Sequence, residues 1–179
     1  MSLPQQYQFL LQEPGPKMLI EALKLFGTKE IFGNKHNQVI LDWAKLVGIP
    51  DLVKDDEQAW CGLFMAVVAI RGQKFVPMKS YDILRAQKWV DFGTPVKEAM
   101  LGDVLIFKRP EGGHVGMYVG EDQDHYHVLG GNQSNMVCIT RVAKARLVGI
   151  RRPIYSIGQP ENIRKIELSA VGAVTSNEA

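Results

Sequence analysis

The sequence predicts an α+β fold in which N-terminal helices pack on a C-terminal antiparallel sheet of about five strands. From Lys17 to about Trp89, apolar residues recur at the three- and four-residue spacing of helices. From about Leu101 to Arg151, they alternate or form short runs between glycine-rich turns, a pattern typical of strands. Helices followed by a run of strands indicate an α+β protein rather than a parallel α/β sheet.

The composition is that of one globular domain. The chain has 179 residues, 46% of them hydrophobic and 22% charged, with a net charge of +2. This charge is too small to indicate nucleic-acid binding, and no apolar run approaches the roughly 20 residues of a membrane span. Two cysteines cannot form a disulfide framework, so we expect free thiols in a reducing compartment. Because Met1–Gln12 lacks the pattern of a signal peptide, we expect synthesis in the cytoplasm without one.

Two amphipathic helices are predicted near the N-terminus. Met1–Pro16 is polar and interrupted by proline, so we expect an irregular lead-in. Lys17–Phe26 has helical apolar spacing and is ended by Gly27. Gln38–Val47 has the same spacing and is closed by Gly48.

The chain is organised around a third predicted helix, Asp55–Ile70. Asp55 or Asp56 can cap its first turn, and Leu63–Ile70 is apolar all round, which predicts a buried helix. Cys61 lies in the first turns, where the positive end of the helix dipole favours a thiolate. The acidic residues just before it act in the opposite direction, so its position alone does not establish activation.

The second half of the chain is predicted to be mostly strands. Tyr81–Trp89 is expected to be helical, Gly130–Asn135 to form a loop or bulge, and Tyr155–Ala179 to be an extension that wraps the domain or a flexible tail. The predicted strands are Asp103–Phe107, His114–Val119, His125–Leu129, Met136–Val142 and Arg146–Arg151.

The residue types suggest thiol chemistry. A catalytic thiolate needs a base within hydrogen-bond reach, and His114 follows a Gly112-Gly113 turn that allows close approach of backbone or substrate. The alternatives are that His114 is a solvent-facing turn residue and that Cys61 is a small apolar residue of a buried helix. The residue types alone do not choose between these interpretations.

Several segments resemble one enzyme superfamily. They are Trp60–Phe64, Leu101–Phe107, Gly113–Gly120, Leu129–Asn135 and Arg146–Pro153. Together and in this order they resemble NlpC-type cell-wall peptidases and the related CHAP amidases, which are papain-like, and in particular a branch found in bacterial and phage proteins. The resemblance implies a papain-like catalytic domain over residues 1–153 and an extension or tail over residues 154–179.

The resemblance also implies catalytic roles, with Cys61 as the nucleophile and His114 as the general base. A third, polar group orients the histidine. A four-residue turn at 121–124 would place Gly131 opposite His114, and His127 would then lie ~13 Å along the strand, too far to touch His114. Asn132 would face the wrong way unless a bulge at Gly130-Gly131 corrects the parity. We therefore favour Asn132 as the third catalytic residue, with His127 second.

The remaining candidates have weaker signals. Gln133 can donate to the oxyanion or to substrate, and Gly113 allows substrate to approach; Trp60, a third substrate-binding candidate, is equally consistent with a place in the core. A metal site built from His125, His127 and Cys138 has no supporting ligand spacing, and His125 and His36 are expected to have no catalytic role. Cys138 is expected to pack within its strand.

The function implied by the resemblance is peptidoglycan hydrolysis by a cysteine peptidase or amidase that needs no metal or cofactor. The bond would be a stem-peptide amide or the sugar–peptide amide, and peptidoglycan would be the partner, without nucleic acid or stable membrane insertion. A phage lysin or an injected antibacterial toxin would act on the wall after release or secretion by another system, and a toxin would have a dedicated inhibitor protein. A non-catalytic wall-binding module and a papain-like enzyme with a non-wall substrate remain alternatives.

Overall fold

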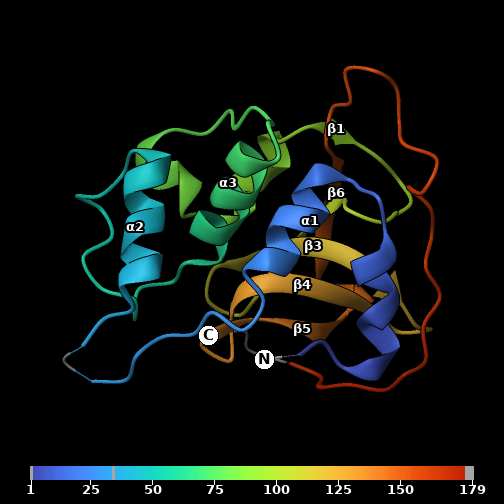
Figure 1. Ribbon diagram of the computed structural model, residues 1–179, viewed down its shortest axis with the longest axis horizontal. Helices are drawn as coiled ribbons and strands as arrows, with labels where there is room; N and C mark the ends of the chain where they lie inside the picture. The colour runs from blue at the N-terminus through green and yellow to red at the C-terminus, as the bar shows by residue number, and fades with distance from the viewer. Residues whose placement is uncertain (1, 34, 176–179) are drawn as a thin grey trace.

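The computed structural model describes residues 2–33 and 35–175, and its architecture is α+β (Figure 1). The α-helices are α1 (Lys17–Lys24), α2 (Gln38–Val47) and α3 (Cys61–Arg71). Four 3-10 helices are η1 (Gln5–Gln12), η2 (Ser80–Ile83), η3 (Ala86–Asp91) and η4 (Lys144–Arg146). The strands are β1 (Thr94–Pro95), β2 (Val104–Lys108), β3 (Gly113–Glu121), β4 (His125–Gln133), β5 (Met136–Ala143) and β6 (Leu147–Arg152).

The first two α-helices match the prediction closely. α2 has the predicted bounds because both ends are marked in the sequence: the Asn37 side chain accepts a hydrogen bond from the backbone N–H of Val39 at 2.9 Å, and Gly48 closes the helix with φ of 81°. α1 begins at Lys17 as predicted and ends two residues early, at Lys24.

The helix α3 is shorter than predicted, because it starts at Cys61 rather than at Asp55. The Asp56 carboxylate does not cap it. Instead, this buried carboxylate accepts hydrogen bonds from the backbone N–H groups of Ile31 and Asn37 and lies 3.0 Å from Nδ1 of His36. A tertiary contact with the preceding loop has therefore replaced the local cap.

α3 is the central element of the core. Cys61–Ala69 are all buried, which confirms the prediction for Leu63–Ala69, whereas Ile70, the last residue of the predicted apolar run, is 37% exposed. The helix contacts β3 and β4 on one side and α1 and α2 on others, and Figure 1 shows it between α2 and the sheet. Over Cys61–Ala69 the helix has no solvated face, so it needs no polar stripe there.

The sheet has six strands in the order β1-β6-β2-β3-β4-β5, and every pairing is antiparallel. The additional strand is the two-residue β1, which pairs with β6. β4 is longer than predicted and runs to Gln133. It is joined to β5 by a two-residue turn, Ser134-Asn135, with φ of 51° and 61°. Positive φ at both positions is typical of the tight hairpin turns that match strand twist.

Two predicted segments have different local structure. Tyr81–Trp89 is not one helix but lies across η2 and η3. The lead-in before α1 contains η1, and its Tyr7 and Leu10 side chains are buried in the core.

The described part of the C-terminal segment packs along the sheet. The backbone N–H of Glu121 donates to the Ile166 carbonyl at 2.8 Å, and the N–H of Leu168 donates to the Glu121 carbonyl at 2.8 Å. Farther on, the N–H of Arg141 donates to the Ala173 carbonyl at 2.8 Å. Residues 176–179 of the predicted tail lie outside the described residues.

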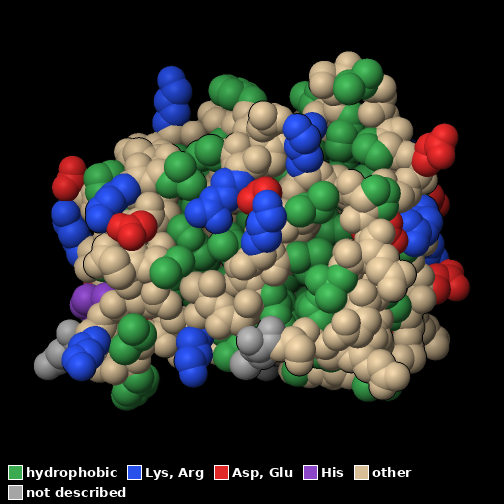
Figure 2. Space-filling view, in the orientation of Figure 1, with side chains coloured by type: hydrophobic (Ala, Val, Ile, Leu, Met, Phe, Trp, Pro, Cys, Tyr) green, Lys and Arg blue, Asp and Glu red, His purple; other side chains and the backbone are tan. Residues whose placement is uncertain are grey.

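Figure 2 shows one face of the molecule, on which Lys and Arg side chains are dispersed, with apolar side chains between them. Several basic residues near the C-terminal strands are in ion pairs: Arg141 with Asp122 at 2.7 Å, Lys144 with Glu121 at 2.9 Å, and Arg152 with Asp103 at 2.8 Å. Among the described helices, none has both the length and the apolar character needed to cross a membrane.

Candidate active site

Cys61 is the first residue of α3 and its side chain is largely buried, with 5% of the residue exposed. The first intrahelical hydrogen bond runs from the N–H of Phe64 to the Trp60 carbonyl. The first turn of α3 contains no acidic residue. Because the predicted acidic start of the helix is not helical, the thiol lies at the positive end of the helix dipole without a carboxylate in the same turn.

His114 is the second residue of β3 and is completely buried. Its ring stacks on Phe107 of β2, with ring centroids 6.4 Å apart and planes 21° from parallel. Its Nε2 lies 3.0 Å from Oε1 of Gln133, at the end of β4. The imidazole is therefore held both by an aromatic face and by a carboxamide.

The orientation of the Gln133 carboxamide follows from its other hydrogen bonds. Nε2 of Gln133 donates to the backbone carbonyls of Cys138 at 2.6 Å and Val128 at 3.1 Å. Carbonyls only accept, so the amide nitrogen must face them and Oε1 must face His114. The Thr140 hydroxyl donates to the same Oε1 at 2.9 Å. Oε1 can accept but not donate, so Nε2 of His114 carries a proton, and Nδ1 is the basic nitrogen of the neutral ring.

The partner of His114 was expected to be Asn132, and in the structure it is Gln133. One reason is the register of the β3–β4 hairpin, in which Tyr118 pairs with Val128 rather than with His127. The other is the bulge. Gly130 pairs with Cys138 and Gln133 with Met136, so β4 uses one more residue than β5 between these pairs. The bulge is near the predicted position, but with the shifted register it turns Gln133 toward His114.

Two adjacent glycines of β4 connect the histidine and the start of α3. A Cβ atom at Gly130 would lie 3.1 Å from Nε2 of His114. A Cβ atom at Gly131 would lie 2.5 Å from Cβ of Phe64 and 2.6 Å from the Trp60 ring. Trp60 immediately precedes Cys61. The same short stretch of β4 therefore contacts His114 and the first turn of α3, which brings the two candidate catalytic segments together.

The other predicted substrate-binding residues are packed within the protein. Trp60 is completely buried, lies edge-on to Trp43 with ring centroids 5.8 Å apart, and donates through Nε1 to Glu30 at 2.7 Å. Of the two places that the sequence allowed for Trp60, in the core or in contact with substrate, the structure shows the core. A Cβ at Gly113 would lie 2.9 Å from the carbonyl oxygen of Phe107, so the close approach there is by the protein's own backbone.

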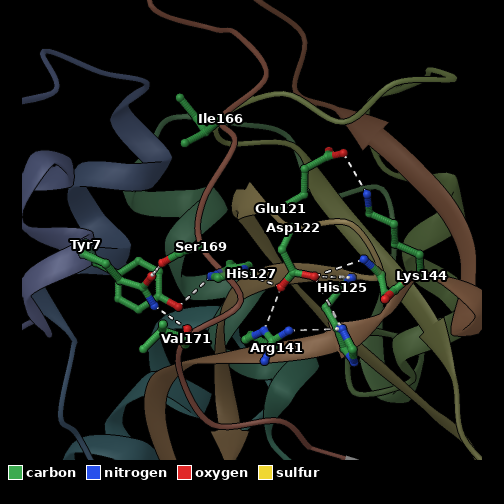
Figure 3. A network of polar contacts seen from close by, with 12 residues as sticks. Tyr7, Glu121, Asp122, His125, His127, Arg141, Lys144, Ile166, Ser169 and Val171 are labelled. Carbon is green, nitrogen blue, oxygen red and sulfur yellow. Dashed lines mark hydrogen bonds and ion pairs between the residues drawn. The ribbon is translucent and has the colours of Figure 1, made fainter.

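His127, the second choice for the third catalytic group, belongs to a separate buried network (Figure 3). Its Nδ1 is 2.7 Å from the Tyr7 hydroxyl and its Nε2 is 3.1 Å from Asp122. Burial lowers the pKa of His127, an effect that Asp122 opposes, and burial raises the pKa of Tyr7 to about 12. The sequence did not reveal this network, because Tyr7 and His127 are distant in the chain.

The remaining predicted residues have structural contacts. Half-buried His125 lies 3.6 Å from Asp122, and His36 contacts Asp56. Neither Cys61 nor Cys138 is in a disulfide, and the Cys138 thiol donates to the Gln133 carbonyl oxygen at 3.2 Å.

Within residues 2–33 and 35–175, no group of three or more His, Cys, Asp or Glu side chains is arranged to hold a metal ion.

A comparison with models of known protein families gives no match, and neither does a comparison with curated proteins.

Proposed function

We propose that this protein is a cysteine hydrolase that cleaves an amide bond in the peptide part of peptidoglycan. The observation that carries the proposal is the fixed carboxamide of Gln133 on Nε2 of His114, on a strand whose Gly131 packs on the helix start that holds Cys61. A histidine held in one tautomer and a thiol at a helix N-terminus are the two groups that thiolate catalysis requires. The choice of peptidoglycan rests on the resemblance of the sequence segments to cell-wall peptidases and amidases.

In the proposed mechanism, Nδ1 of His114 takes the proton of the Cys61 thiol. The thiolate attacks the amide carbonyl carbon, and the carbonyl oxygen becomes an oxyanion near the first-turn N–H groups of α3. The imidazolium then gives its proton to the leaving amine as the carbon–nitrogen bond breaks. Water, losing its proton to His114, attacks the thioester, and the collapse of this second intermediate releases the carboxylic acid and the thiolate.

Gln133 contributes by keeping the ring in the productive orientation. Its Oε1 accepts from Nε2–H both in the neutral ring and in the imidazolium, so the imidazole does not need to reorient between the two proton transfers. An uncharged acceptor also leaves the imidazolium less stabilised than a carboxylate would, which favours return of the proton to the leaving amine.

Digestion of purified peptidoglycan tests the proposal. Wild-type protein and the Cys61→Ala variant are incubated with walls, and the products are analysed by mass and by the appearance of new amino groups. We expect soluble fragments with wild type and none with the variant. Fragment masses distinguish a bond within the stem peptide from the sugar–peptide amide.

The other outcomes point to the other classes of protein. If neither protein releases fragments but an iodoacetamide probe still labels Cys61 rapidly, the substrate is not peptidoglycan. If wild type binds walls, cleaves nothing and leaves Cys61 unreactive, the chain is a binding module. Equal cleavage by wild type and Cys61→Ala would reject the thiol mechanism.

A further inference from the structure

Asn132 has an unusual backbone conformation within the β4 bulge. Its φ is 57°, in the left-handed region, although it is not a glycine. Asparagine adopts this region more readily than most residues, but the conformation still carries a cost, and such residues concentrate at functional sites. The backbone at this position is therefore held by its surroundings, with Gly131 packed on α3 and Gln133 fixed on His114.

The side chain of Asn132 is also unusual. The residue is 5% exposed, yet its carboxamide makes no hydrogen bond to any residue within the described parts of the chain. The neighbouring carboxamide of Gln133 is buried too, and both its nitrogen and its oxygen have partners. The polar atoms of the Asn132 side chain are not among the fully buried, unpartnered atoms of the described residues, so they keep some contact with solvent. The carboxamide is therefore open to a hydrogen bond with a molecule outside the chain.

The position of Asn132 indicates which partner. The residue before it contacts Trp60, which precedes Cys61, and the residue after it contacts His114. Asn132 therefore lies in the chain between one residue that contacts the start of α3 and one that contacts His114. A peptide group has one donor and one acceptor, which an asparagine carboxamide complements.

We propose that the Asn132 carboxamide is a substrate-binding group that donates its N–H to the carbonyl oxygen of the bond being cleaved. This inference rests on the proposed function and refines it. Gln133 positions His114, whereas Asn132 contacts substrate and stabilises the negative charge that develops when Cys61 attacks. The two adjacent amides, one buried and satisfied and the other unpaired, have separate tasks.

Two rate measurements on the full chain separate the positioning of His114 by Gln133 from the contact of Asn132 with substrate. One is cleavage of wall fragments, giving kcat and KM. The other is alkylation of Cys61 by iodoacetamide, which requires an activated thiolate but forms no oxyanion. The variants are Asn132→Gly, which accepts positive φ and removes the amide, and Gln133→Leu, which removes the partner of His114. Thermal unfolding of each variant confirms that it is folded.

For Asn132→Gly we expect kcat/KM to fall about 100-fold, the usual effect of losing one oxyanion donor, with the alkylation rate within about two-fold of wild type. For Gln133→Leu both rates should fall together. Asn132→Asp, which also tolerates left-handed φ, should fold and lose cleavage as Asn132→Gly does, since a carboxylate repels an oxyanion.

Two results would overturn the inference alone. One is cleavage by Asn132→Gly within about three-fold of wild type. The other is a parallel loss of alkylation and cleavage in this variant, which would mean that Asn132 acts through His114. Wild-type protein that neither cleaves walls nor reacts at Cys61 would instead overturn the proposed function, and this inference with it.

Discussion

Replacing Asp122 with asparagine is expected to lower the melting temperature by roughly 10 °C. The Asp122 carboxylate is buried and is the centre of the network in Figure 3. It accepts hydrogen bonds from Nε of Arg141 at 2.7 Å and from the backbone N–H groups of Asp124 and His125 at 3.0 Å, and lies 3.1 Å from Nε2 of His127. These contacts join β4 and β5 to the turn that precedes β4.

The magnitude follows from what asparagine leaves behind. The Asp122 carboxylate can only accept, so Nε2 of His127 carries a proton and donates to it, as Nε–H of Arg141 does. Nδ1 of the neutral His127 ring then accepts from the Tyr7 hydroxyl. An asparagine NH₂ would face one of these donors and would leave the Arg141 charge buried without a counterion. Breaking a buried ion pair in this way costs about 3–5 kcal/mol, and for a chain of this size each kcal/mol lowers Tm by about 2–4 °C.

Thermal unfolding followed by far-ultraviolet circular dichroism measures the effect. Asp51→Asn is the matched control, because Asp51 pairs with Lys54 at 3.1 Å on the surface and its side chain is 94% exposed. We expect that variant to melt within about 1 °C of wild type. If Asp122→Asn also melted within about 1 °C of wild type, the assignment of a buried, stabilising network would be refuted.

The Tm difference between wild type and Asp122→Asn is also expected to depend on pH. Burial alone would raise the pKa of Asp122, but the hydrogen bonds from Arg141, from the two backbone N–H groups and from His127 together hold this pKa well below its ordinary value. The carboxylate therefore stabilises the fold above pH ~4, and this contribution is lost as the pH falls further. The Tm difference between wild type and Asp122→Asn should shrink between pH 7 and pH 3, and a constant difference would contradict this linkage.

Three further predictions concern the surroundings of the site. Gly131→Ala should destabilise the fold by about 1–3 kcal/mol in urea unfolding, since the added Cβ would lie 2.5 Å from a carbon of α3. Thr140→Val keeps the shape but removes the donor to Oε1 of Gln133, so kcat/KM should fall about ten-fold with little change in Tm. Burial raises the pKa of Cys138 to about 11, so mass spectrometry after brief iodoacetamide treatment at pH 7 should find Cys61 labelled and Cys138 unlabelled.

Local patterns were sufficient for most of the fold. α2 was predicted to the residue from its apolar spacing and the closing Gly48, and the Asn37 cap in the structure marks the same start. The buried character of α3 followed from its continuous apolar sequence. Its start did not, because Asp56 is drawn into contacts with Ile31 and Asn37, and these contacts depend on the path of the preceding loop.

In the candidate site, the bulge near Gly130 was predictable from the sequence, but the face of β4 that it turns toward His114 was not. The catalytic roles of Cys61 and His114 stay a prediction. A one-residue shift in hairpin register exchanges the two faces of a strand, so the choice between Asn132 and Gln133 could not be made from spacing alone. Contacts between distant segments, such as that of Tyr7 with His127, have no local signal in the sequence.

The pH dependence of Cys61 alkylation in wild type and His114→Ala tests the central claim most directly, because it reports the coupling of thiol and imidazole without assuming a substrate. If the two residues act as a pair, wild type will react rapidly at pH 6, where an ordinary thiol is almost entirely protonated, and His114→Ala will lose this reactivity. Reaction of both proteins only above pH 8, along the same curve, would contradict the account.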